Sequence, residues 1–145
     1  MELDTGLDNH GYITIYPDGN GGNWAGANYS HNTLDQDFQF SKDLLADVRK
    51  NFCVDSSKIY ATGISNGGGF VGALACNADA GGEYAAFAPV AGTFYPESDP
   101  GLGGGCAPAR SVTPMLEFNG LLDTSAKYDG GPGVSIFSYW MWFEF

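Results

Sequence analysis

The sequence predicts an α/β domain in which helices flank a mostly parallel sheet. Three observations indicate this class: short apolar segments alternate with helical patterns, one apolar segment leads directly into a Gly-x-Ser-x-Gly pattern, and Gly- and Pro-rich turns separate the elements. Strands that alternate with helices pair in parallel, because each helix returns the chain to the starting edge of the sheet. The 145 residues fit one domain, although the chain is short for a complete sheet of this kind.

The charge balance narrows the classes of partner. Six Lys and Arg against 17 Asp and Glu give a net charge of −11, which argues against nucleic acid and anionic membranes as partners. No apolar run approaches the ~20 residues of a membrane-spanning helix, and residues 1–4 lack the pattern of a signal peptide. The three cysteines and two histidines do not have metal-ligand spacing, so we expect no structural metal site.

The first predicted element is a strand over residues 12–16, which a Pro-Asp-Gly turn closes. A long polar loop follows to about residue 32, and loops of this length inside a compact domain often carry function. The aromatic residues Trp24 and Tyr29 are candidates for lining a substrate groove in this loop. Alternatively, Trp24 anchors the loop on the core, because tryptophan is highly buried on average. The sequence leaves both interpretations open.

A helix is predicted over residues 35–51, where apolar side chains recur at helical spacing. Asp35 and Asp37 at its start and Arg49 and Lys50 at its end complement the helix dipole. We therefore interpret these four charges as structural rather than catalytic.

The strongest signal is the apolar strand of residues 59–62, which leads into a Gly-x-Ser-x-Gly pattern centred on Ser65. A serine on a sharp turn between a strand and a helix projects its hydroxyl above the sheet, and Gly63 and Gly67 lack the Cβ atoms that would obstruct the turn. We predict Ser65 as a nucleophile and the backbone N–H of Asn66 as one donor of an oxyanion hole. With 22 glycines in the chain, a serine in an ordinary glycine-rich turn is the alternative.

The remaining elements continue the alternation of helices and strands. We predict a glycine-rich helix over residues 66–77, a buried strand over residues 84–90, a loop over residues 93–112 and a last strand over residues 114–118.

A nucleophilic serine needs a base, and the base needs an acid that holds its tautomer. In enzymes whose nucleophilic serine lies on this kind of turn between a strand and a helix, the acid and then the histidine follow the serine in the sequence. Asp123, a few residues beyond the last predicted strand, fits the acid, with Asp99 and Asp129 as weaker candidates.

Both histidines, His10 and His31, precede Ser65. The base expected after the serine is therefore absent from these residues, and His31 could replace it only by breaking the usual order. We expect this chain by itself to be inactive or nearly so.

The cysteines allow one estimate from element lengths. The stretch from Lys58 to Gly63 rises about 20 Å and the helix of residues 66–77 descends about 18 Å, so Cys53 and Cys76 return to a similar level. A disulfide between them, which would imply an oxidising compartment, is one interpretation. Two buried thiols are the other.

A long, ordered set of motifs covers about residues 11–131. They are Tyr16-Pro17-Asp18-Gly19, Trp24, residues 35–40, Phe52-Cys53-Val54-Asp55, residues 59–69, Leu74-Ala75-Cys76, Pro89-Val90-Ala91-Gly92, and residues 114–118 with Asp123 and residues 128–131. In these motifs the sequence resembles the secreted feruloyl esterases of fungi and the related polyhydroxybutyrate-depolymerase-like esterases of the α/β-hydrolase superfamily.

The resemblance implies Ser65 as nucleophile, Asp123 as triad acid, an extracellular location and no cofactor. The implied substrates are feruloylated plant cell-wall xylan or small hydroxycinnamate esters. An acetyl-xylan esterase or a polyhydroxybutyrate depolymerase on the same scaffold is an alternative, because the serine motif does not select the acyl group. From another class, a non-catalytic carbohydrate-binding remnant would use Trp24 and Tyr29 as a stacking platform.

Two departures from the family bear on completeness. The family usually has His-Gly where this chain has Asn119-Gly120, and it begins with a further strand whose loop completes the oxyanion hole. We therefore expect residues 1–134 to form an esterase domain that is incomplete at both ends. Residues 135–145 are expected to be an atypical aromatic tail.

Overall fold

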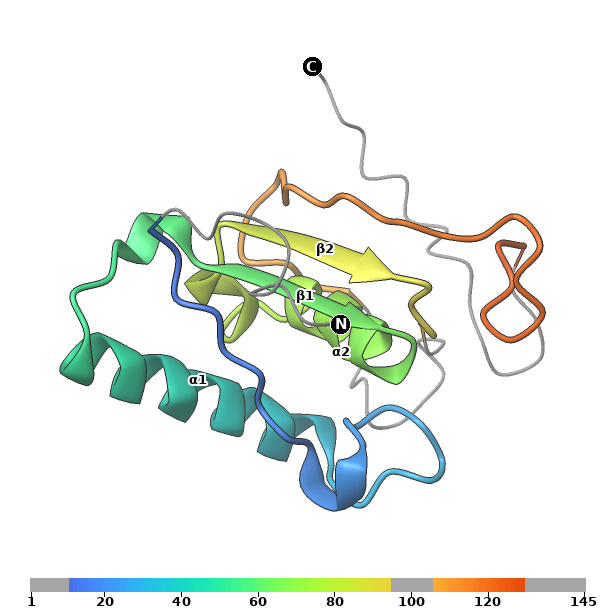
Figure 1. The fold of residues 1–145 in the computed structure, drawn as a ribbon, viewed down its shortest axis with the longest axis horizontal. Helices are drawn as coiled ribbons and strands as arrows, with labels where there is room; N and C mark the ends of the chain where they lie inside the picture. Colours follow the sequence, from blue (N-terminus) through green and yellow to red (C-terminus); the bar gives the residue numbers. More distant parts are fainter. Residues whose placement is uncertain (1–10, 95–105, 130–145) are drawn as a thin grey trace.

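In the part of the chain that the structure describes, two α-helices and two strands form the regular part of the fold (Figure 1). The computed structural model describes residues 11–94 and 106–129. In chain order the elements are α1 (Leu34–Asn51), β1 (Tyr60–Ile64), α2 (Asn66–Ala75) and β2 (Ala86–Val90), with short 3-10 helices at Asn20–Gly22, Ser56–Lys58 and Gly81–Glu83. The strands pair in parallel, with Tyr60 opposite Ala86 and Ile64 opposite Val90. The predicted α/β order and parallel pairing are confirmed.

The predicted strand at residues 114–118 pairs with β2 at only two points. Phe87 forms a parallel bridge with Met115, and Val90 forms one with Phe118. Between these pairs lies Pro89, which has no N–H to donate, so a continuous ladder cannot form. Figure 1 shows this segment, in orange, beside β2 on the side away from β1.

The strand predicted at residues 12–16 is not formed. Tyr12 and Ile13, which alternation would place on opposite faces, are 60% and 50% exposed. A strand needs a neighbour for its backbone N–H and C=O groups, and among the described residues no strand pairs with this segment. The rings of Tyr12 and Tyr60 are in contact, with centroids 6.3 Å apart.

Helix α1 has well-defined ends, as predicted. Thr33 Oγ1 accepts a hydrogen bond from the Gln36 N–H at 3.3 Å, and the Gln36 side chain accepts one from the Thr33 N–H at 2.9 Å. This capping box satisfies two backbone donors at the helix start. Near the other end, Arg49 forms an ion pair with Glu83 at 2.6 Å.

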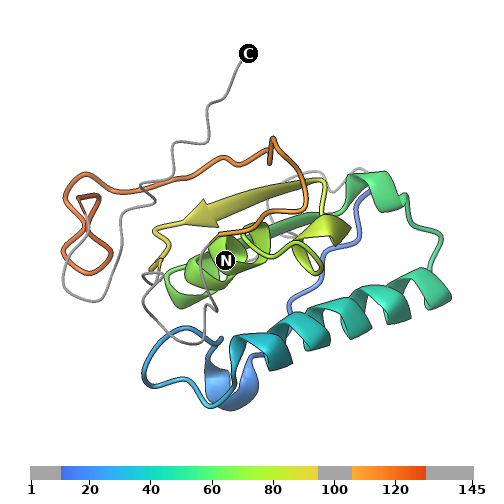
Figure 2. The same cartoon turned by 180° about the vertical axis from the view of Figure 1, so that it is seen from behind.

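Helix α2 packs on the sheet and supplies much of the core (Figure 2). Within the core, the hydroxyls of Ser41 on α1 and Tyr84 before β2 are 2.6 Å apart. Burial raises the pKa of Tyr84 above its usual value. The main core cluster consists of Ala25, Leu34, Leu45, Ala61, Phe70, Val71, Leu74, Ala75, Ala80, Tyr84, Phe87 and Met115.

The predicted pairing of Cys53 with Cys76 is wrong. Cys76 is bonded to Cys106, and Cys53 is an exposed free thiol. The element lengths fixed only the level of Cys53 and Cys76 along the strand direction, not their sideways separation. Cys76 ends α2, and the chain at residues 106–107 returns beside it, where the Ala107 N–H donates to the Cys76 carbonyl at 2.8 Å.

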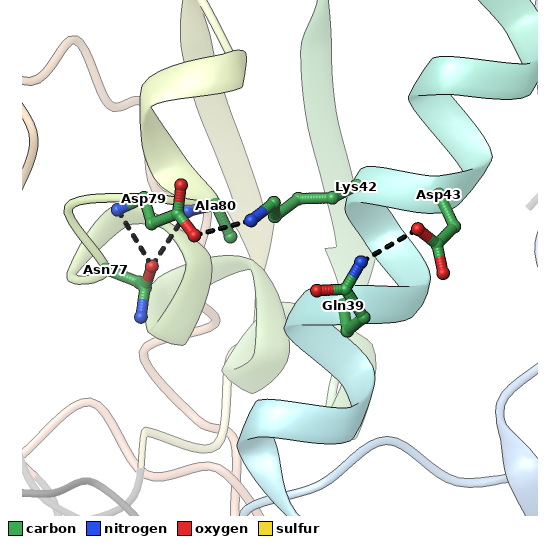
Figure 3. A network of polar contacts seen from close by, with 6 residues as sticks. All are labelled: Gln39, Lys42, Asp43, Asn77, Asp79 and Ala80. Carbon is green, nitrogen blue, oxygen red and sulfur yellow. Dashed lines mark hydrogen bonds and ion pairs between the residues drawn. The ribbon is translucent and has the colours of Figure 1, made fainter.

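A small polar network connects α1 with the turn after α2 (Figure 3). The Asn77 side-chain oxygen accepts hydrogen bonds from the backbone N–H groups of Asp79 at 3.0 Å and Ala80 at 2.8 Å. Lys42 forms an exposed ion pair with the Asp79 carboxylate at 2.5 Å. The two hydrogen bonds that the Asn77 side chain accepts are therefore expected to contribute more to the stability of the fold than the ion pair.

We expect Asn77→Ala to lower the free energy of unfolding by about 1 kcal/mol, because two backbone donors lose their acceptor. Lys42→Ala should leave the urea midpoint unchanged, since solvent screens this ion pair. Urea denaturation of both variants tests the ranking. A larger loss in Lys42→Ala would contradict it.

Candidate active site

Ser65 occupies a strained position between β1 and α2. Its backbone has φ 55° and ψ −117°, in a region that side-chain-bearing residues rarely adopt. Surrounding hydrogen bonds hold this conformation. The Ser65 N–H donates to the Val90 carbonyl at 3.0 Å, and the Ser65 carbonyl accepts from the N–H groups of Gly69 at 2.9 Å and Thr93 at 3.2 Å. The C-terminal end of β2 and the residues that follow it therefore stabilise the turn that carries Ser65.

The turn is possible because three segments approach without side chains between them. A Cβ on Gly63 would lie 2.7 Å from the Gly67 backbone, and a Cβ on Gly68 would lie 2.9 Å from the Gly92 Cα atom. Real Cβ atoms essentially never make contacts this short. The end of β1, the first turn of α2 and the residues after β2 consequently pack backbone against backbone.

Two polar groups at this turn are free within the described part of the chain. The Ser65 side chain is exposed, and its hydroxyl has no hydrogen-bond partner among the described residues. The backbone N–H of Asn66, the first residue of α2, has no acceptor among them either. The positive end of a helix dipole and a free N–H favour negative charge at this position. Both the helix dipole and the Asn66 N–H would stabilise an oxyanion formed next to Ser65.

The side chain of Asn66 fixes the long loop that precedes α1. Its oxygen accepts a hydrogen bond from the Trp24 N–H at 2.8 Å, and its amide donates to the Trp24 carbonyl at 3.0 Å. This two-way pairing joins the residue after Ser65 to a loop 42 positions earlier in the chain. The sequence predicted a role only for the backbone of Asn66.

The contacts of Trp24 favour the anchoring interpretation. Its ring stacks on Phe70 of α2 with centroids 4.9 Å apart and planes 6° apart, and it lies 6.0 Å from the ring of Phe40. Trp24 is partly buried and packs against the core cluster. Tyr29, in contrast, is 55% exposed. A substrate-groove role for both residues stays a prediction.

Asp37 holds the same loop from α1. It is only 1% exposed, and its two carboxylate oxygens accept hydrogen bonds from the Ala25 N–H at 2.7 Å and the Asn32 side-chain amide at 2.5 Å. From the sequence, Asp37 was predicted to interact with the helix dipole, and its position in the first turn of α1 is compatible with that role. Its burial and its loop contacts were missed, because no local pattern reveals them.

Asp123 lies beyond the segment that pairs with β2. The parallel bridge between Val90 and Phe118 places the ends of β2 and of this segment at the edge where Ser65 lies. One oxygen of Asp123, Oδ1, accepts hydrogen bonds from the N–H groups of Ser125 at 2.8 Å and Ala126 at 2.9 Å. The other oxygen has no partner among the described residues, and no hydrogen bond joins Asp123 to Ser65.

Two of the other sequence candidates, His31 and Asp129, make no hydrogen bond to Ser65 among the described residues. His31 is exposed, and its ring lies over Gly21 in the loop before α1. Asp129 is exposed as well, whereas His10 and Asp99 lie outside the described residues. Among the described residues, no histidine makes a hydrogen bond to Ser65 or Asp123.

Sequence reasoning also missed Thr93 and Asn119. The Thr93 hydroxyl donates to the Ser65 carbonyl at 3.3 Å, in addition to the bond from the Thr93 N–H. The side-chain oxygen of Asn119 is buried without a donor in the described part of the structure. The available signal for Thr93 was its place three residues after a predicted strand. For Asn119 it was the place directly after a predicted strand, where the family usually has a histidine.

None of the helices in the described part of the chain is both long and apolar enough to span a membrane. In residues 11–94 and 106–129, no three acidic, histidine or cysteine side chains gather as a metal site.

Comparison with known proteins supports the fold and shows the family. The model of the prolyl oligopeptidase family matches residues 5–99. Feruloyl esterase B of Piromyces equi is 38% identical over 96 residues, which cover 66% of this chain and 17% of the relative. Feruloyl esterase C of Emericella nidulans and probable feruloyl esterase C of Aspergillus niger are 32% and 31% identical over 119 residues, which cover 82% of this chain and 38% of each relative.

The chain thus spans well under half the length of these relatives. The matched family model includes β1, Ser65, α2 and β2. The chain therefore belongs to the prolyl oligopeptidase family, and both its predicted α/β-hydrolase fold and its resemblance to fungal feruloyl esterases are confirmed.

Proposed function

We propose that this protein is a serine carboxylesterase that cleaves feruloyl esters through an acyl-enzyme at Ser65. The observation that carries the proposal is the strained turn at Ser65, which presents an exposed hydroxyl beside the backbone N–H of Asn66, a donor with no acceptor in residues 11–94 and 106–129. Strain of this kind, about 1–3 kcal/mol, persists where the surrounding structure enforces it and often marks a functional site.

In the proposed reaction, Ser65 Oγ attacks the ester carbonyl carbon and its proton passes to a histidine base. The Asn66 N–H stabilises the resulting oxyanion, and Asp123 orients the histidine through its free carboxylate oxygen. The C–O bond to the alcohol breaks, and the alcohol takes the proton. Water then hydrolyses the acyl-enzyme by the same steps and releases the acid.

No histidine occurs after Ser65 in these 145 residues. The base of the proposed reaction is therefore not one of the residues that follow Ser65 here. We therefore propose that the chain by itself retains only residual activity, in the range of about 10³–10⁴ over water that binding and the oxyanion hole supply in such sites.

Feruloylated xylan and small hydroxycinnamate esters are the proposed substrates, because several similar proteins are named feruloyl esterases. The disulfide between Cys76 and Cys106 is typical of oxidising compartments and supports an extracellular location. Residues 1–134 are proposed to form part of the esterase domain. The aromatic tail at residues 135–145 lies outside the described residues.

The test is the hydrolysis of methyl ferulate by the purified chain, with and without added imidazole as an external base. We expect slow hydrolysis that imidazole accelerates, and a feruloyl group on the peptide that contains Ser65. Ser65→Ala should abolish both effects, whereas the exposed Ser111→Ala should change neither.

Three outcomes would contradict parts of the proposal. Equal imidazole-dependent rates in the parent chain and Ser65→Ala would exclude Ser65 as nucleophile. Rapid turnover without imidazole would show that the chain already contains a base, and His31→Ala would then identify or exclude His31. Faster cleavage of an acetyl ester than of methyl ferulate would change the proposed acyl group.

A further inference from the structure

The loop before α1 contains a tripeptide that the catalytic proposal does not use. Asn28-Tyr29-Ser30 is the only Asn-x-Ser/Thr sequence in the 145 residues, and its middle residue is not proline. This pattern is the acceptor for N-linked glycans in secreted proteins, but it also occurs by chance. Structural context must therefore decide whether the asparagine is suitable.

The structure places Asn28 where a glycan fits. Asn28 and Tyr29 are exposed residues of a turn, in which the Ser30 N–H donates to the Ala27 carbonyl at 3.0 Å. A glycan attached to an exposed turn extends into solvent and displaces no core side chain.

The amide of Asn28 also differs from its neighbours, because other asparagine amides around it have structural partners. Asn20 donates to Asn32, Asn23 donates to the Gly21 carbonyl, and Asn32 donates to Asp37. The Asn28 side chain has no hydrogen-bond partner among the described residues. Its modification would break none of the contacts that hold the loop.

A second, independent observation concerns the compartment. The disulfide between Cys76 and Cys106 joins positions 30 residues apart, and such bonds form in oxidising compartments such as the lumen of the endoplasmic reticulum. N-linked glycans are transferred to nascent chains in that same lumen. A chain that acquires this disulfide in that lumen is exposed to the transfer reaction there.

We propose that Asn28 is an N-glycosylation site. In the reaction, the Asn28 amide nitrogen bonds to the anomeric carbon of an oligosaccharide carried on a lipid diphosphate. The bond from that carbon to the diphosphate oxygen breaks, the lipid diphosphate leaves, and the amide loses one proton. The inference rests on the extracellular location proposed above and is independent of the role of Ser65.

The test uses the full chain, secreted from yeast behind a cleavable leader. Glycosidase treatment and peptide mass spectrometry should find a glycan on the peptide that contains Asn28. Asn28→Gln should remove the glycan completely. Asn20→Gln, another exposed asparagine of the same loop but without a hydroxyl residue two positions later, should retain it.

The same sample should be mapped for the bond between Cys76 and Cys106. A secreted chain with that disulfide formed and Asn28 unmodified would overturn the proposal. A glycan that persists in Asn28→Gln would also overturn it, because the modification would then lie elsewhere. Neither result depends on esterase activity, so failure of this inference is distinguishable from failure of the proposed reaction.

Discussion

Asp37→Ala is expected to lower the free energy of unfolding by about 2–4 kcal/mol. The substitution removes both acceptors of a nearly fully buried carboxylate, and hydrogen bonds to charged groups each contribute about 1.5–3 kcal/mol. The Ala25 N–H, which is buried, and the Asn32 amide would both lose their partner. Urea denaturation, monitored by circular dichroism, measures the loss.

The matched control is Asp35→Ala, because Asp35 is an exposed acid in the same first turn of α1. Its only expected contribution is to the helix dipole, about 0.3–1 kcal/mol. Equal losses in the two variants would contradict a special role of Asp37. If Asp37→Ala does not fold, Asn32→Ala removes one of the two bonds and should give a smaller, measurable loss.

The effect of Asp37 should reach the candidate active site. Asp37 holds Ala25, and the adjacent Trp24 is bonded in both directions to Asn66. Because Asn66 directly follows Ser65, a loosened loop removes a support from the proposed oxyanion donor. Faster amide hydrogen exchange at Trp24 and Ala25 in the Asp37 variant, but not in the Asp35 variant, would report this coupling.

The parts of the fold that the sequence predicted are those that local patterns determine. Helix α1 has both a capping residue and charges suited to its dipole, so its observed start is one residue from the expected one. The turn at Ser65 was predictable because its glycines and the flanking apolar strand are neighbours in sequence. The close contact of Gly63 with the Gly67 backbone supplies the physical reason for that pattern.

The failures concern partners that are distant in sequence. The alternation at residues 12–16 describes the faces of a possible strand, but it cannot supply the neighbour that a strand must pair with. The role of Asp37 depends on Ala25 and Asn32, which reach it through a loop without periodicity. In both cases the local pattern described the residues themselves, but it did not show which distant residues they contact.

The Cys76–Cys106 disulfide carries the second large expected effect. A cross-link between positions 30 residues apart restricts the unfolded chain and should stabilise the fold by about 3–4 kcal/mol in the chain-entropy account. It also holds the segment that leads to the strand pairing of Met115 with Phe87, and through it the segment that carries Asp123. Loss of the disulfide should therefore lower the stability of the fold and loosen the segment that carries Asp123.

We expect Cys76→Ser to lower the free energy of unfolding by that amount, whereas Cys53→Ser should have little effect because Cys53 is an exposed free thiol. Chemical denaturation of the two variants, with and without a reductant, is the measurement. Reductant should destabilise the parent chain and Cys53→Ser but leave Cys76→Ser unchanged. An equal response of Cys53→Ser and Cys76→Ser to reductant would contradict the observed pairing, because only the former retains both cysteines of the bond.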